Sequence, residues 1–122
     1  IYVTNESSVT HTYDPYLFES VCYMYNELMK YGENWNVEHF EERCGRRFLR
    51  STIATIVKDS HNLQYSNFKK KVTDIKNNSI YKYCYRNDLN SISKSRQLFL
   101  KMLDNCNYYT CYLMGKMKKV IN

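Results

Sequence analysis

Apolar side chains recur every three or four residues through most of this chain, which is the spacing of one face of an α-helix. Asp14-Pro15 favours a helix start, because Asp caps exposed amides and Pro is tolerated in the first turn. Gly32 favours the end of that helix. Its expected apolar stripe consists of Leu17, Phe18, Val21, Cys22, Tyr25, Leu28 and Met29. Residues 1–13 lack this periodicity and are expected to be extended or loosely ordered.

A second helix is expected after a turn, with Asn36 as its cap and Lys58 near its end. Its apolar stripe consists of Val37, Phe40, Cys44, Phe48, Ile53, Ile56 and Val57. Two antiparallel helices joined by a short turn form a helical hairpin, which we place over residues 15–58.

The second half of the chain repeats this pattern less clearly. Ser66 favours the start of a short helix, within a linker over residues 59–76, and Ser79 the start of a longer one. A turn over residues 90–95 leads to a last apolar stripe, which either continues past residues 105–107 or breaks there. The pattern therefore predicts one all-α domain over residues 1–122, with hairpins over 15–58 and 77–120 and a bridging helix between them.

The cysteines reinforce the division into halves. Cys22 and Cys44 lie 22 positions apart, as do Cys84 and Cys106, and the first cysteine of each pair precedes a tyrosine, Tyr23 or Tyr85. An offset of 62 positions also matches several apolar residues. These matches predict an old tandem duplication of one hairpin.

In each half the two cysteines flank the expected turn at similar distances, so antiparallel helices would bring them to the same height. We therefore expect disulfides Cys22–Cys44 and Cys84–Cys106, with Cys111 as a free thiol. Two alternatives stay open: Cys111 replaces Cys106, or a bond joins the two halves. With five cysteines in the chain, at least one is left unpaired.

Composition limits the size and the class of the protein. The chain has 122 residues, 43% hydrophobic and 25% charged, which suits one compact domain rather than a disordered chain. One proline and three glycines argue against turn-rich β folds. No apolar run is long enough for a membrane span. Two possible glycosylation sequons, at Asn5 and Asn77, fit secretion, with a signal peptide expected to be removed before residue 1.

The two Cys-Tyr…Cys units, Cys22-Tyr23…Cys44 and Cys84-Tyr85…Cys106, resemble the BICYCLE proteins, secreted effectors of aphids that are named for paired cysteine–tyrosine–cysteine motifs. Cys111 lies outside these units. The resemblance implies a salivary protein that is delivered into plant tissue and acts on host development or defence. It implies no enzyme activity.

A binding surface is expected from charge and aromatic content. The net charge is +6, and four arginines fall on one helix face: Arg43, Arg46, Arg47 and Arg50. Three tyrosines, Tyr108, Tyr109 and Tyr112, follow in the last apolar stripe, and exposed Tyr with Arg is typical of protein interfaces. We therefore expect an unknown host protein as partner. Nucleic acid is disfavoured, because no nucleic-acid-binding signature accompanies the basic clusters.

Catalytic and metal sites are not indicated by the sequence. No histidine stands three or four positions from a cysteine or from another histidine, so we expect no metal and no cofactor. His39 and Cys44 are five positions apart, so on a helix their side chains would point in different directions, and we expect no enzyme. The sequence favours a secreted, non-enzymatic effector. Two alternatives are a four-helix cytokine-like receptor ligand, which predicts no internal repeat, and an intracellular helical inhibitor similar to the poxvirus Bcl-2-like proteins.

Overall fold

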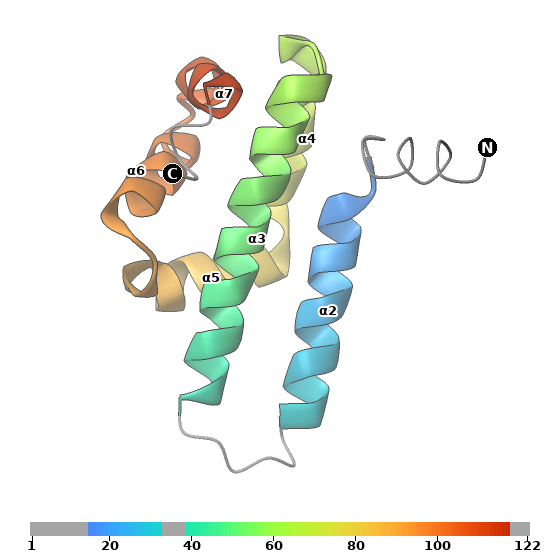
Figure 1. Ribbon diagram of the computed structural model, residues 1–122, viewed down its shortest axis with the longest axis vertical. Coiled ribbons are helices and arrows are strands. Elements are labelled where there is room, and N and C mark those ends of the chain that lie inside the picture. Colours follow the sequence, from blue (N-terminus) through green and yellow to red (C-terminus); the bar gives the residue numbers. More distant parts are fainter. Residues whose placement is uncertain (1–14, 33–38, 118–122) are drawn as a thin grey trace, which may run out of the picture.

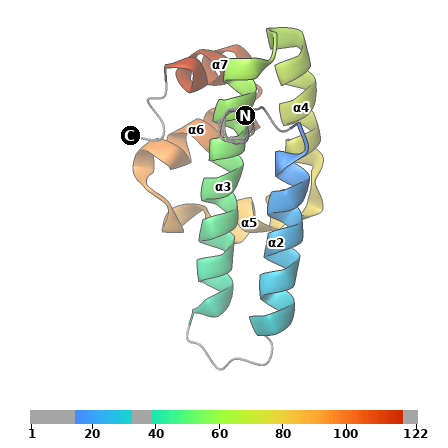
Figure 2. The same cartoon turned by 45° about the vertical axis from the view of Figure 1, so that its right-hand side comes forward.

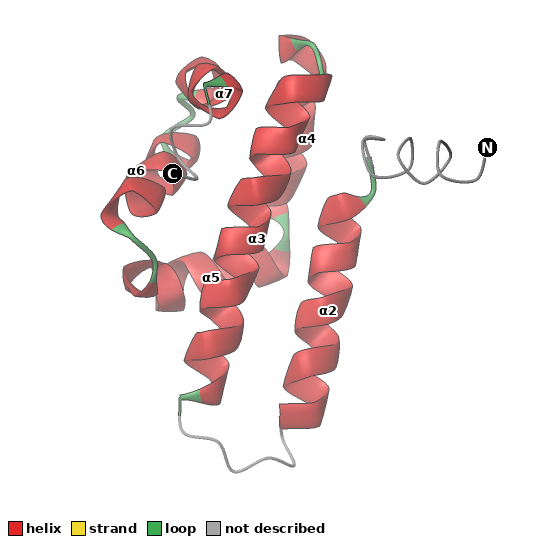
Figure 3. Cartoon of the chain, viewed as in Figure 1, coloured by secondary structure: helices red, strands yellow, loops and turns green. Residues whose placement is uncertain are grey.

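The computed structural model describes residues 15–32 and 39–117, and this part of the chain is all helical. Its elements are the helices α2 (Leu17–Gly32), α3 (Phe40–Asn62), α4 (Tyr65–Asn77), α5 (Ser79–Asp88), α6 (Lys94–Asp104) and α7 (Tyr108–Lys116), with a 3-10 turn, η1 (Leu89–Ser91), before α6. Figure 3 shows only helices and loops in these residues. The predicted all-α class is confirmed. The cap predicted at Asn36 and the segment 1–13 lie outside the described residues.

The helices α2 and α3 run antiparallel, side by side (Figures 1 and 2). Phe18 and Tyr25 of α2 pack edge to face on Phe48 of α3, with ring centroids 6.0 and 5.4 Å apart. The first predicted hairpin is therefore present, although α3 continues to Asn62 rather than ending near Lys58.

Helix α3 is the centre of the domain. It contacts each of the other helices, and its buried face includes Phe48, Leu49, Ile53 and Ile56, all at most 2% exposed. The predicted bridging helix is confirmed as α4, whose Phe68, Val72 and Ile75 are buried as its apolar stripe predicts. Around α3 the core is completed by Tyr81, Cys84, Phe99, Leu100, Leu103 and Cys111.

Ser79, which the sequence predicts as the cap of this helix, is the first residue of α5, and Asn78 is the cap instead. The Asn78 Oδ1 accepts hydrogen bonds from the backbone N–H groups of Ile80 and Tyr81, at 2.9 and 3.1 Å. A side-chain oxygen in this position satisfies amides that a helix start leaves without partners.

The last apolar stripe breaks after α6. Cys106 has a left-handed backbone with φ 66°. Its N–H donates to the Leu103 carbonyl at 3.1 Å, while the N–H of Asn107 donates to Met102 at 2.9 Å. This pair of bonds is the Schellman ending of a helix, in which the left-handed position favours glycine. The chain then turns into α7, which packs against the C-terminal part of α3 (Figure 2).

The second half therefore contains three helices where one hairpin is predicted. Under the 62-residue offset, the start of α2 at Leu17 matches the start of α5 at Ser79. The start of α3 at Phe40 instead matches Met102, in the interior of α6. The duplication stays a prediction. Among the described residues, no helix is both long enough and apolar enough to cross a membrane.

Candidate functional site: an arginine groove

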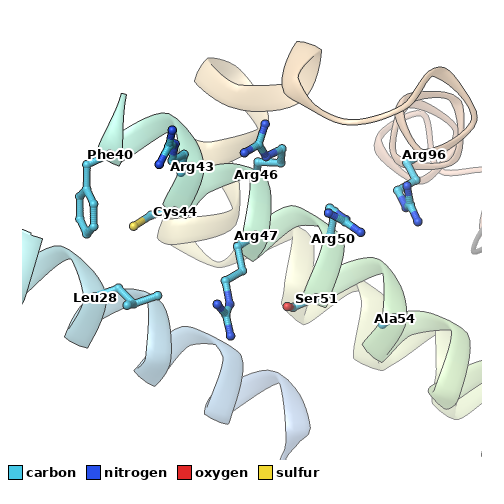
Figure 4. A pocket seen from close by; sticks show the side chains of 10 residues that line it. All are labelled: Leu28, Phe40, Arg43, Cys44, Arg46, Arg47, Arg50, Ser51, Ala54 and Arg96. Atoms are coloured by element: carbon cyan, nitrogen blue, oxygen red, sulfur yellow. The ribbon is translucent and has the colours of Figure 1, made fainter. Parts of the chain in front are cut away.

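Helix α3 presents four arginines in its first three turns. Arg43, Arg46, Arg47 and Arg50 lie at i, i+3, i+4 and i+7, a spacing that keeps them on one side of a helix. Cys44, Gly45, Phe48 and Leu49 occupy the intervening positions and are buried, which fixes the rotation of α3. The charged stripe predicted from the sequence is therefore held by a core-packed helix, and Figure 4 shows its four side chains leaving α3.

These arginines line a groove of about 760 Å³. A fifth arginine, Arg96, reaches the groove from α6 (Figure 4). Between the guanidinium groups, the lining contains Leu28, Phe40, Cys44, Ser51 and Ala54. The site thus combines an apolar floor with a cationic rim, which is the composition of a surface for an oriented ligand.

Among the described residues, the charged ones that line the groove are all arginines. Five of the six arginines in the chain line it, whereas no described lysine does. No described carboxylate lines it either, and none lies within 4.0 Å of these five guanidinium groups. Arginine differs from lysine in offering a planar fork of N–H donors that matches the two oxygens of a carboxylate or a phosphate. The groove therefore offers N–H donors that can bind an oxyanion.

Arg96 is the residue of this site that the sequence pattern does not predict. It lies 46 positions after Arg50, in the first turn of α6, and that turn contains no acidic residue. Its Nη1 donates to the Ser93 hydroxyl at 3.3 Å. Only the packing of α6 beside α3 brings it to the groove, so no local signal could have revealed it.

The predicted tyrosines lie elsewhere. Tyr108, Tyr109 and Tyr112 belong to α7, and Tyr112 donates to the Leu63 carbonyl, at the end of α3 opposite to the arginines, at 2.8 Å. Tyr65 packs edge to face on both Tyr109 and Tyr112, with centroids 5.2 and 5.5 Å apart. No described tyrosine lines the arginine groove. The expected single basic, Tyr-rich surface therefore separates into two regions.

The five cysteines are free thiols in the structure, so neither the Cys22–Cys44 nor the Cys84–Cys106 bond is formed. Cys84 is fully buried while Cys106 is exposed on the turn after α6, which places the two on different parts of the domain. Cys22 and Cys44 instead lie near Cys84. Burial raises the pKa of the Cys84 thiol to about 11, and the charges of Cys22 and Cys44 add to this shift.

Cys111 is fully buried, and its thiol donates to the Phe99 carbonyl at 3.7 Å. The exposed thiol is that of Cys106. The Tyr108 hydroxyl at 3.6 Å and the Lys76 ammonium at 3.5 Å both donate to its sulfur. These hydrogen bonds lower the pKa of the Cys106 thiol, because they stabilise its anion.

The tyrosines of the two Cys-Tyr units have different surroundings. Tyr23 is 64% exposed, and its hydroxyl donates to Glu27 at 3.1 Å. Tyr85 is half-buried and stacks on Tyr81, with ring centroids 5.9 Å apart. The structure thus gives the two tyrosines no common role.

Metal ligands are not gathered in the part of the chain that the structure describes: it holds no group of three or more His, Cys, Asp or Glu side chains that could bind an ion. Comparison of the sequence and the structure with known protein families, curated proteins and solved structures finds no match.

Proposed function

We propose that this protein is a non-enzymatic binding protein whose arginine groove holds an acidic segment of a partner protein. One observation carries the proposal: five of the six arginines converge on one groove in which no described carboxylate neutralises them. Like charges that line one groove repel one another, so an anion that enters the groove is attracted by several guanidinium groups at once.

The mixed lining favours a protein segment over single-stranded nucleic acid. Nucleic acid binding of this kind needs aromatic side chains on which bases stack, next to the charges that hold the backbone. Here the tyrosines of α7 pack around Leu63 and Tyr65, and among the described residues that line the groove Phe40 alone is aromatic, beside the aliphatic Leu28 and Ala54. Apolar side chains of a peptide fit such a floor, and its Asp or Glu residues fit the rim.

The biological role that we propose follows from the resemblance of the two Cys-Tyr…Cys units to the BICYCLE proteins. We propose a secreted effector, similar to aphid salivary proteins, that is built from two duplicated hairpins and stabilised by the disulfide Cys22–Cys44. Its partner would be a host protein. Within this proposal, the groove replaces the combined Arg and Tyr surface as the binding site.

The test is the affinity for a fluorescent oligoglutamate peptide, measured by anisotropy. Arg47→Gln with Arg50→Gln removes two exposed groove charges, and Lys82→Gln with Arg86→Gln removes two exposed charges from α5, outside the groove. We expect the groove variant to lose on the order of tenfold in affinity, since each charged contact contributes about 1 kcal/mol. Equal losses in both double variants would show that the peptide follows net charge only, and would overturn the proposal.

A further inference from the structure

The arginine groove does not end at α3. A second hollow, of about 200 Å³, lies between α2 and α3 and shares Leu28, Cys44, Arg47 and Ser51 with the first. Its remaining lining is mostly apolar and includes Leu17, Val21 and Met24 of α2. The two hollows therefore adjoin each other, the first with a cationic rim and the second mostly apolar.

The apolar lining from α2 is a regular stripe. Leu17, Val21, Met24 and Leu28 follow one another at spacings of four, three and four, so they lie on one side of α2. At 1.5 Å per residue the stripe is about 17 Å long, which is three helical turns. Met24 is 49% exposed, a large fraction for an apolar side chain at the edge of a helix pair.

The cationic hollow lies beside the apolar one. The helices α2 and α3 lie side by side and antiparallel (Figures 1 and 2), and Arg47 points from α3 toward α2 (Figure 4). Arg47 lines both hollows. A ligand that fits both hollows needs apolar groups for the α2 stripe and negative charges for the arginines.

We infer that the two hollows together take an amphipathic helix of the partner protein, with its apolar side chains on the α2 stripe and its Asp and Glu residues on the arginines. The inference rests on the proposed function and names the form of the acidic segment. An α-helix repeats every 3.6 residues, as the α2 stripe does, so its apolar face can follow that stripe over three turns. A second copy of this chain fits poorly, since its net charge of +6 would oppose the arginines.

Two labelled peptides test this inference. Both have about 16 residues, enough to span the stripe as a helix, and both contain the same leucines, glutamates and alanines. In the first, the leucines form one helical face and the glutamates flank it on one side. In the second, the same residues are permuted so that leucines point to all sides. We expect the first peptide to bind on the order of tenfold more tightly and to gain helical circular dichroism signal on binding.

Variants of the protein locate the contact. Met24→Gln removes an apolar group from the stripe, and Tyr23→Gln changes its exposed neighbour, which lines neither hollow. We expect Met24→Gln to weaken the first peptide on the order of fivefold and Tyr23→Gln to leave its affinity within about twofold, because burial of one side chain contributes about 1 kcal/mol or more. The second peptide should not distinguish the two variants.

The outcomes separate the two proposals. If both peptides bind equally and lose affinity with Arg47→Gln and Arg50→Gln, the acidic groove stands and the amphipathic helix is refuted. If neither peptide nor oligoglutamate binds, both proposals fail. Concentration-dependent dimerisation that Met24→Gln abolishes would assign the stripe to a second copy and would also overturn the inference.

Discussion

Gly115 lies at the contact between α7 and α3. A Cβ atom placed on Gly115 would lie 2.4 Å from the Ser60 Oγ, 2.9 Å from the Ser60 Cβ and 3.5 Å from the Val57 Cα. Ser60 is fully buried, and its hydroxyl donates to the Val57 carbonyl at 2.6 Å. Its short side chain has no free space to move into, so Gly115→Ala has to push α7 away from α3.

Two opposing effects set the size of this change. Alanine is more favourable than glycine inside a helix by about 1 kcal/mol, so an exposed Gly→Ala change would stabilise the protein. Overpacking at a tight contact costs about 1–3 kcal/mol. It would also loosen the helix that carries the buried Cys111. We expect a net loss of about 1 kcal/mol in the free energy of unfolding, and a Tm lower by about 3–6 °C.

Urea denaturation followed by circular dichroism measures this loss. The control is the same change in a Ser60→Ala background, where the nearest atom, Oγ, is absent. Gly115→Ala should cost less there, and the difference between the two backgrounds gives the coupling across the α3–α7 contact. If Gly115→Ala instead raised the stability by the amount expected for an exposed site, α7 would not pack on α3 as described.

Three further predictions concern a helix cap and the thiols. Asn78→Ala should lower the free energy of unfolding by about 1 kcal/mol, because two amides of α5 lose their acceptor; a similar loss in Asn77→Ala, its exposed neighbour, would contradict this. Limited alkylation of the reduced protein at neutral pH should modify Cys106 first, whereas Cys84 and Cys111 should react only after unfolding. Peptide mass spectrometry identifies the labelled cysteines. Rapid labelling of Cys111 would show that α7 is not packed on α3. Burial raises the pKa of Cys84 to about 11 and that of Cys111 to about 12, from an ordinary 9.0. The folded state thus keeps protons that the unfolded chain loses, so the stability of the reduced protein should hold up to about pH 9 and fall above it; urea midpoints that stay constant through pH 10.5 would refute this.

Local features of the fold could be predicted from the sequence, and its tertiary features could not. The apolar spacing and Gly32 predict α2, and the spacing of Phe68, Val72 and Ile75 predicts α4. Both helices can be predicted because their signals lie in residues that are close together in the sequence. The break after α6 stays undecided in the sequence. Cys106 takes a left-handed conformation at a position that glycine would normally mark, so the sequence leaves a break at residues 105–107 as one of two alternatives.

The arginine groove likewise has a part that the sequence predicts and a part that only the tertiary structure shows. Four arginines of one helix are predictable as a stripe from their spacing alone. Arg96 joins them only because α6 packs beside α3, and the tyrosines of α7 separate from them because Gly115 fixes where α7 docks. The disulfide expectation assumes that equal spacing means equal geometry. In the structure Cys106 lies on an exposed turn, while Cys22, Cys44 and Cys84 share one region.

The most direct test of the central claim is an NMR titration that observes the arginine side-chain Nε–Hε groups. The chain has six arginines, and five of them line the groove. On addition of the oligoglutamate peptide, we expect the signals of Arg43, Arg46, Arg47, Arg50 and Arg96 to shift together with one saturation curve, while Arg86 stays in place. A shift of Arg86 as large as the others, or saturating shifts confined to backbone amides of the lysine-rich α4, would contradict an arginine groove as the binding site.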